Sequence, residues 1–364
     1  MFDRALPFTL LLLLSTASVP GFALEKPPVS TVDRLKQDDD EEEVDAFPPS
    51  PLELDEDDPL LPAVDRPLTP TERQILAREL DRLNAEAQAE YEAGNVGEAF
   101  ELWNRELRLR RFISSTSELQ ALGRVGAIAW EESDLQQVQA IGQRLRVIER
   151  ELFYPEVEEN DWDELDEYEP VTVDVAVLQP LAAAYDAAGA RDEAARIYNL
   201  ILVQLRSQNN RIALEETLQS LAQLNLKRLN YEAAAQNYEE LVELTLARGN
   251  RASAVIYLEQ LAFAYDRLED PARSLPVRQQ LLEYYTAQQN GSKVVELQLG
   301  IGQDYKALGQ LNNAIDSYEA AYSLAWSLQE LHQAARSLQL LAELYESQRR
   351  FDAALQVYRA ELEV

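Results

Sequence analysis

The sequence predicts an all-α fold, a solenoid of about seven helical hairpins, from three observations. From residue 171 to the C-terminus the chain repeats every 40 residues without insertion or deletion. Within that repeat, one column is mostly aromatic and two others hold only small residues. Gly and Asn recur between the apolar stretches, where they end helices. A fixed period of this size indicates units that bury their apolar faces only against neighbouring units.

The three columns can be read directly from the sequence. The mostly aromatic column holds Tyr185, Asn225, Tyr265, Tyr305 and Tyr345. The small columns hold Ala182, Ala222, Ala262, Gly302 and Ala342, and then Ala194, Ala234, Ser274, Ala314 and Ala354. Small side chains allow two helices to approach closely, and aromatic rings fill the space to the next pair. Each unit is therefore predicted to be two helices of about 17 residues, and Pro180 is expected to delay or kink one of them.

Residues 1–24 have the pattern of a secretory signal peptide. Arg4 precedes an apolar run from Leu6 to Val19, and the small residues Gly21 and Ala23 follow it. The run is short for a membrane span of about 20 apolar residues. We expect a cleaved signal and an exported protein. The alternative is an uncleaved N-terminal membrane anchor.

Two acidic segments flank or interrupt the predicted repeats. Residues 25–68 are rich in Pro, Asp and Glu, so we expect a disordered linker. Thr69 and Glu72 then form a predicted capping box with Pro70 between them, and the solenoid is expected over 69–364. An acidic insertion at 151–170 separates the second repeat from the third.

The composition excludes several classes of function. The 364-residue chain has no cysteine, one histidine (His332) and a net charge of −32, which argues against nucleic acid as a partner. We find no catalytic motif around His332 and predict neither an enzyme nor a cofactor. Carboxylates suit Ca²⁺ and Mn²⁺, so a divalent metal-binding or metal-delivery protein that uses the acidic segments is the alternative function.

The repeat resembles the tetratricopeptide repeat. One copy reads Ile301, Gly302, Tyr305, Gly309, Leu311, Ala314 and Tyr318, and the resemblance covers residues 70–364. The usual unit has about 34 residues, whereas the longer unit found here is similar to the kinesin light chain type. The resemblance implies a right-handed superhelix that binds proteins or peptides on its concave face.

The leader, the absence of cysteine and the acidic linker make the chain similar to exported tetratricopeptide proteins of cyanobacteria. Some of those proteins assist the assembly of photosynthetic complexes. This resemblance implies a non-enzymatic scaffold or assembly factor in the periplasm or the thylakoid lumen.

The first helix of each unit is expected to line the concave groove. Two positions of that helix, three before and one after the small column, should face the partner. The candidate binding residues there are Gln179, Gln219, Gln223, Phe263, Gln303 and Gln339. A glutamine amide both donates and accepts, which suits an extended peptide backbone.

The last helix offers a second candidate surface. Ala353, Val357, Ala360 and Val364 form a small apolar stripe, which we expect to contact a second copy in a homodimer or a partner protein. Phe351, Ala354, Leu355, Tyr358 and Leu362 are expected to pack against their own hairpin.

Overall fold

The computed structural model describes residues 50–52, 58–62, 66–158, 162, 165 and 168–361. The predicted signal peptide and residues 25–49 of the predicted linker lie outside the described residues. The chain divides into two units, Met1–Pro48 with Glu156–Pro170, and Pro49–Pro155 with Val171–Val364. Only a few residues of the first unit are described, so the fold presented here is that of the second. Among the described helices, none is long and apolar enough to cross a membrane.

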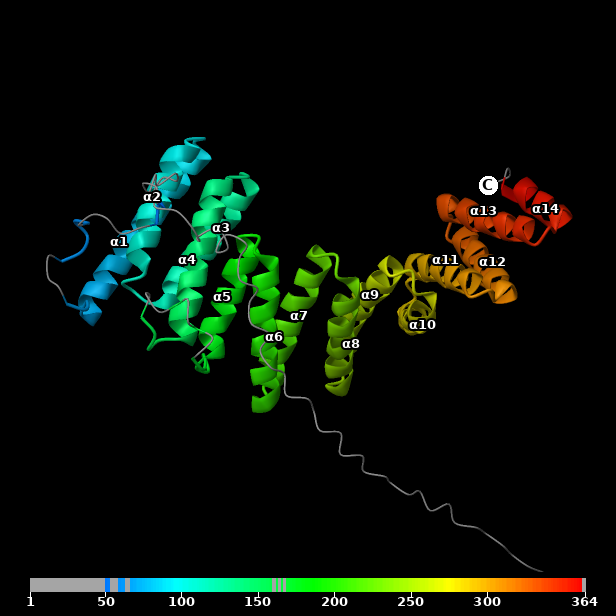
Figure 1. Cartoon of the computed structure of the whole chain (residues 1–364). Helices are drawn as coiled ribbons and strands as arrows, with labels where there is room; N and C mark the ends of the chain where they lie inside the picture. The colour runs from blue at the N-terminus through cyan, green and yellow to red at the C-terminus, as the bar shows by residue number, and fades with distance from the viewer. Residues whose placement is uncertain are drawn as a thin grey trace, which may run out of the picture. The chain divides into compact units, whose positions relative to one another are not determined.

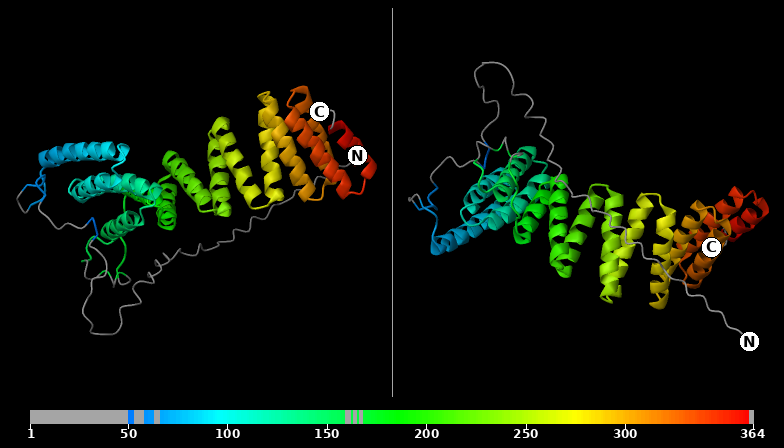
Figure 2. Two further views of the ribbon diagram at one scale, coloured as in Figure 1. Left: turned by 90° about the horizontal axis from the view of Figure 1, so that it is seen from above. Right: turned by 60° about the horizontal axis from the view of Figure 1, so that its bottom comes forward.

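The second unit is all-α, as predicted, and its described residues contain fourteen helices. Figures 1 and 2 show them side by side in chain order. The helices are α1 (Pro70–Glu92), α2 (Val96–Arg110), α3 (Ser115–Glu131), α4 (Leu135–Phe153), α5 (Val175–Ala187), α6 (Arg191–Gln208), α7 (Arg211–Lys227), α8 (Tyr231–Ala247), α9 (Arg251–Arg267), α10 (Pro271–Ala287), α11 (Gly291–Ala307), α12 (Leu311–Ser327), α13 (Leu331–Ser347) and α14 (Phe351–Glu361).

The turns between helices recur at half the length of the repeat. A left-handed residue ends each helix from α5 to α13, at Gly189, Asn209, Leu229, Gly249, Glu269, Gln289, Gly309, Gln329 and Arg349. The next residue donates its N–H to a carbonyl five positions back, as Asn230 does to Asn225 at 2.9 Å. This Schellman pattern satisfies the last carbonyls of the helix. Both turns of a repeat are therefore built in the same way.

In most of these turns, the residue after the left-handed one also caps the start of the following helix. The side chain of Asn230 accepts a hydrogen bond from the N–H of Ala233, and Asn210, Asn250 and Asn290 cap their helices similarly. Asn suits this position because its side-chain oxygen satisfies a backbone N–H of the first turn. Thr69 and Glu72 form the predicted capping box at the start of α1.

The small columns lie where consecutive helices pack. Ala182, Ala222 and Ala342 of the first helices are fully buried, as are Ala194, Ala234, Ser274 and Ala314 of the second helices. At Gly302 a Cβ atom would stand 2.4 Å from the ring of Tyr318, so the ring occupies the space that a side chain would need. The predicted pattern of small residues thus marks the close contacts within the hairpins.

The junction at the acidic insertion departs from regular stacking. Of the two helices that precede it, α5 packs mainly on α3 and only weakly on α4. Gly123 and Gly126 of α3 allow this approach, because a Cβ atom at either would stand 3.2 Å from Ala184 or Ala188 of α5. Helix α4 continues to Phe153, so the first residues of the predicted insertion are helical. Helix α5 begins late, at Val175, and contains Pro180 in its first turns.

The end of the predicted linker differs from the expected disorder. Its described residues include Leu52, which is buried in the main core, and Asp58, which binds α2. The expectation of disorder rested on the overall composition of the segment. It did not consider that single residues such as Leu52 and Asp58 could bind the helices.

Candidate functional site

The predicted groove residues lie on the first helices of successive hairpins. Gln219 and Gln223 of α7, Phe263 of α9, Gln303 of α11 and Gln339 of α13 are exposed, whereas Gln179 of α5 is half-buried. Phe263 and Gln303 of this set line a cleft together. The cleft is the candidate site.

The cleft has a volume of about 430 Å³ and is formed by α9, α10, α11 and α13. Several of its lining residues lie one or two turns before the predicted positions on the same helices. The lining residues are Glu259, Ala262, Phe263, Asp266, Arg278, Leu281, Tyr285, Lys293, Glu296, Leu297, Leu299, Gly300, Gln303, Gln333 and Arg336. Three successive repeats therefore contribute to one concavity.

Apolar side chains provide a surface for a partner. Ala262, Leu281 and Leu299 are almost completely buried, while the ring of Phe263 is 48% exposed. The Phe263 ring also meets the edge of the Tyr231 ring at a centroid distance of 6.4 Å, which fixes its position. An exposed ring held in place beside an apolar wall is able to bury an apolar group at little entropic cost.

Arg278 fixes one wall of the cleft. Its guanidinium donates to Asp304 at 2.7 Å and to Asp266 at 2.6 Å. A Cβ atom at Gly300 would stand 2.7 Å from the Arg278 Nε atom, so glycine allows the arginine to cross α11. Burial raises the pKa of Asp304, and the hydrogen bond from Arg278 opposes this effect. The pair is structural, since both charges are satisfied within the protein.

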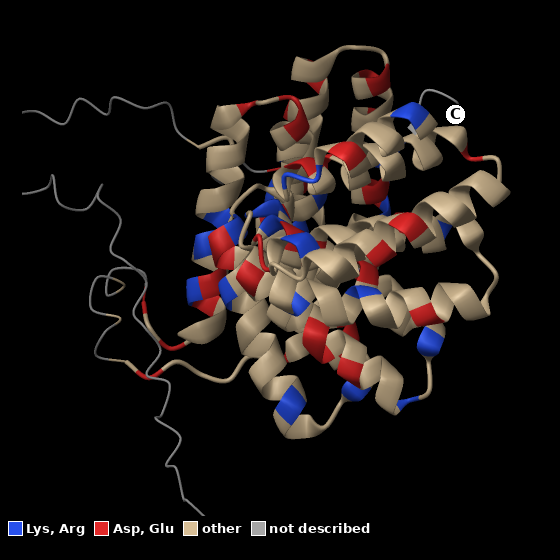
Figure 3. Cartoon of the chain, turned by 90° about the vertical axis from the view of Figure 1, so that its right-hand side faces the viewer, with Lys and Arg blue, Asp and Glu red and all other residues tan. Residues whose placement is uncertain are grey.

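Most of the other charges at the cleft are paired as well. Lys293 approaches Glu296 at 3.1 Å and Glu259 at 3.7 Å, and the Tyr285 hydroxyl donates to Glu259 at 2.9 Å. The hydrogen bond to Glu296 raises the pKa of Lys293, so the lysine stays charged. Figure 3 shows the same mixture of basic and acidic residues along the helices of the unit. The cleft has no strong excess of one sign.

Two polar groups on α13 have no partner among the described residues. The Gln333 Oε1 atom is buried and accepts no hydrogen bond from the described residues. Arg336 lies one turn further along α13, is exposed, and forms no ion pair with a described acidic residue. A segment that offers an N–H to Gln333 and a carboxylate to Arg336 would satisfy both groups.

Sequence reasoning missed Gln333 and Arg336 because it examined only two positions per helix. Gln333 and Arg336 precede the predicted Gln339 by six and three residues. Arg336 lies on the same helix face as Gln339, whereas Gln333 lies beside that face. Lys293 and Glu296 stand 40 residues before Gln333 and Arg336, so they occupy the same positions in the preceding repeat. Extending the predicted columns by two turns would have included all four residues.

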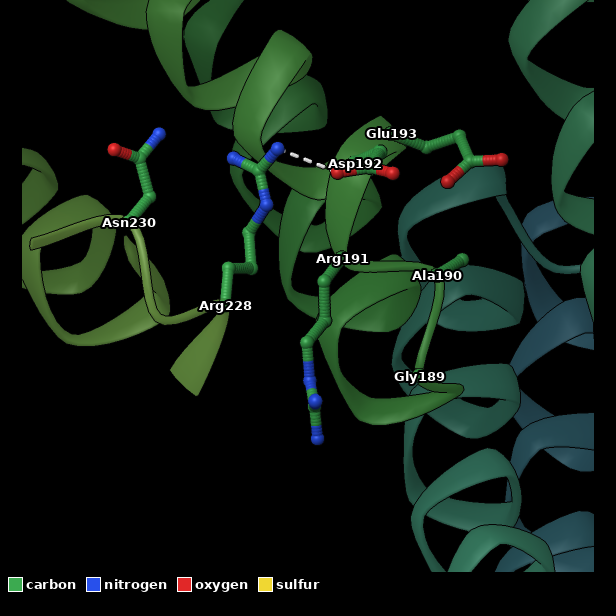
Figure 4. Close-up of a pocket in the computed structure, with 7 residues that line it drawn as sticks. All are labelled: Gly189, Ala190, Arg191, Asp192, Glu193, Arg228 and Asn230. Atoms are coloured by element: carbon green, nitrogen blue, oxygen red, sulfur yellow. Dashed lines mark hydrogen bonds and ion pairs between the residues drawn. The ribbon is translucent and has the colours of Figure 1, made fainter. Parts of the chain in front are cut away.

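A second concavity lies at the turns before α6 and α8. It measures about 460 Å³ and is lined by Gly189, Ala190, Arg191, Asp192, Glu193, Arg228 and Asn230. Figure 4 shows Arg228 turned toward Asp192, with which it pairs at 2.5 Å, while Arg191 extends away from them. The Arg191 guanidinium lies over the Trp130 ring. This concavity lacks a large apolar side chain to bury against a ligand, so it is the weaker candidate.

The C-terminal helix presents apolar residues other than the predicted ones. Ala353 and Val357 of the predicted stripe are half-buried and pack against the core, and Ala360 is half-buried. Val364 lies outside the described residues. Phe351 and Leu355, expected to pack inside, are 65% and 51% exposed. The equivalent of Leu355 in α8, Ala235, is buried, because there the next hairpin covers this position. The predicted role of the stripe in a dimer stays a prediction.

Among the described residues, no group of three or more His, Asp or Glu side chains is arranged to hold a metal ion. His332 is exposed near the start of α13. The metal hypothesis rested on the two acidic segments, and much of them, including residues 25–49, lies outside the described part of the chain.

The architecture is that of tetratricopeptide-like repeats, and solved structures with such repeats resemble it. One is a signal transduction ATPase with a tetratricopeptide repeat sensor from Pyrococcus horikoshii, with 14% identity, 80% of this chain and 43% of that chain covered, and a TM-score of 0.43. Another is a set of kinesin light chain repeats from Podosopora anserina, with 15% identity, coverage of 60% and 99%, and a TM-score of 0.39.

A third structure is MamA from Desulfovibrio magneticus, with 14% identity, coverage of 51% and 92%, and a TM-score of 0.35. No family model and no curated protein matches the sequence. The tetratricopeptide-like fold is seen in this chain itself, in its paired helices and its recurring turns.

Proposed function

We propose that the chain is a non-enzymatic scaffold that binds an extended segment of a partner protein in the cleft between α9 and α13. The observation that carries this proposal is the combination of the exposed Phe263 ring with the exposed Arg336 guanidinium, which forms no ion pair with a described residue, beside the Gln333 Oε1 atom, which accepts no described hydrogen bond. The ring supplies apolar area, and the polar groups supply direction and selectivity. A partner segment with an apolar or aromatic residue close to a carboxylate fits these features.

Export and a role in assembling photosynthetic complexes are finer parts of this proposal. They are supported by the predicted leader over 1–24 and by the resemblance in sequence character described above. The cleft itself is compatible with any extended partner of the stated chemistry.

The test selects peptides from a displayed library on the full chain and measures their affinity for cleft variants. Phe263→Ala and Arg336→Glu should each weaken binding by roughly 1 kcal/mol or more, through loss of apolar area or reversal of charge. Val203→Ala and Arg359→Glu are matched controls, because both residues are exposed on helices that do not line the cleft. Peptides that bind all four variants equally would place recognition elsewhere.

A further inference from the structure

The N-terminal acidic segment contacts α2 through a row of arginines. Arg105 and Arg108 belong to α2, and Arg111 is its C-cap, so the three follow at three-residue intervals. Residues three apart on a helix lie on neighbouring positions of one face, about 4.5 Å apart along the axis. The row therefore presents three guanidinium groups to the same segment.

Each arginine holds a different group of that segment. The Arg105 guanidinium donates to both carboxylate oxygens of Asp58, at 2.7 and 3.0 Å. Arg108 donates to the carbonyl oxygen of Pro51 at 2.5 Å, and Arg111 to that of Leu52 at 2.7 Å. The Leu52 side chain is only 4% exposed. A buried apolar anchor with a row of donors beside it is the arrangement of a peptide-binding site.

The described part of the segment does not fill this site completely. Arg108 and Arg111 donate to backbone carbonyl oxygens, whereas a carboxylate would form a stronger hydrogen bond with a guanidinium. The Nε atom of Arg111 is buried and donates to no described acceptor. Burial lowers the pKa of Arg111, and the neighbouring positive charge of Arg144 lowers it further. Arg144 is itself paired with Glu118 and Glu151, so those carboxylates are already engaged.

We propose that Arg105, Arg108 and Arg111 form a second peptide-binding site, which takes an acidic segment of a partner protein and is occupied in cis by Pro51, Leu52 and Asp58. The ligand is an extended peptide with a leucine-like anchor and carboxylates that reach Arg108 and Arg111. This site lies on α2, whereas the cleft lies between α9 and α13, so the two proposals succeed or fail independently.

The contact of Pro51, Leu52 and Asp58 with the arginine row competes with any partner peptide for the same site. A tethered segment acts at an effective concentration of roughly millimolar order, which lowers the apparent affinity of any ligand for the same site. Weakening the cis contact should therefore expose the arginine row. The affinity should also fall with added salt, since the recognition is largely ionic.

The experiment measures fluorescence anisotropy of a labelled peptide, SPLELDEDDPLLP, which copies residues 50–62. It is added to the full chain, to the Leu52→Ala/Asp58→Ala chain, and to that chain with Arg108→Gln and Arg111→Gln. We expect the second protein to bind about tenfold more tightly than the first, because one bidentate ion pair and one anchor are removed from the competitor. The third should lose this binding. A peptide with Asn and Gln in place of every Asp and Glu is the matched control.

Equal affinity for the first two proteins would overturn the proposal, as would binding that survives the loss of both arginines. Because Leu52→Ala could loosen the core, the single change Asp58→Asn provides an independent arm. It retains the buried anchor and should still raise the affinity of the peptide above that of the unchanged chain. No increase with a circular dichroism spectrum like that of the unchanged chain would also refute the proposal.

Discussion

At the scale of single residues, the structure explains why certain positions of the repeat tolerate only small side chains. Gly302 and Tyr318 belong to the two helices of one hairpin, and the tyrosine ring lies where a Cβ atom would be. The ring is fully buried, so it has little room to move away. Ala182 and Ala222 stand at the position of Gly302 in two other repeats, which also carry a tyrosine at the position of Tyr318, Tyr198 and Tyr238. The need for glycine at 302 therefore comes from the local placement of the Tyr318 ring and not from the residue type alone.

Gly302→Ala should destabilise the protein by about 1–3 kcal/mol, because the added methyl group overpacks against the Tyr318 ring. Thermal unfolding followed by circular dichroism measures the change. Gly97→Ala in α2 is the matched control, since a Cβ atom there meets nothing within 4 Å. It should be neutral or slightly stabilising, because alanine favours helix more than glycine does. Equal losses in both variants would mean that the contact with Tyr318 is not the cause.

At the scale of elements, each turn performs two tasks with adjacent residues. A left-handed residue ends one helix, and the following residue caps the next. The side chain of Asn230 supplies such a cap to α8, whereas Gln310 occupies the same place before α12 and makes no side-chain cap bond. Helices α8 and α12 are equally long, but only α8 begins with a side-chain cap hydrogen bond.

Asn230→Ala should cost about 1 kcal/mol, because the N–H of Ala233 loses its acceptor. Denaturant unfolding provides the measurement. The corresponding change Gln310→Ala should have almost no effect, since no cap bond is removed. If both changes cost the same, helix propensity and not capping would determine the result.

At the scale of the whole molecule, buried tyrosines connect the helices along the row of repeats. Burial raises the pKa of Tyr318 to about 12, and burial together with a hydrogen bond to Glu259 raises the pKa of Tyr285 to about 12. Burial likewise raises the pKa of Tyr185, Tyr238 and Tyr265. A tyrosine with a raised pKa in the folded state binds its proton more tightly there than in the unfolded chain. Its contribution to stability is full below pH 10 and is lost as the pH rises through the folded pKa.

The melting temperature should therefore remain level up to about pH 9.5 and fall steeply between about pH 10 and pH 12. The melting temperature of the Tyr318→Phe variant should fall less steeply over this range, because the variant lacks the hydroxyl proton of Tyr318. The Tyr318 hydroxyl is buried and has no hydrogen-bond partner among the described residues, so the change should cost little at neutral pH. Melting curves at closely spaced pH values test this, and identical slopes for the two proteins would contradict it.

The site was only partly predictable from the sequence. Phe263 and Gln303, which the repeat register selected, both line the cleft. Their contact with a partner stays a prediction. The register also included Gln179, which is half-buried, since α5 sits at the irregular junction where it packs on α3. The exposure of Phe351 and Leu355 was predicted incorrectly for a related reason. The register indicates which face a neighbour covers, but α14 has no following hairpin among the described residues.

The sequence by itself determined the class of fold, the repeat, the helix ends and the columns of small residues. These features depend on hydrogen bonds and steric contacts between residues close in the chain, so local residue types are sufficient to specify them. Only the tertiary structure decided that three repeats enclose the cleft with Gln333 and Arg336, and that Asp58 and Leu52 bind the arginines of α2. Those contacts join residues far apart in the chain, and their existence depends on how successive helices are oriented when they pack.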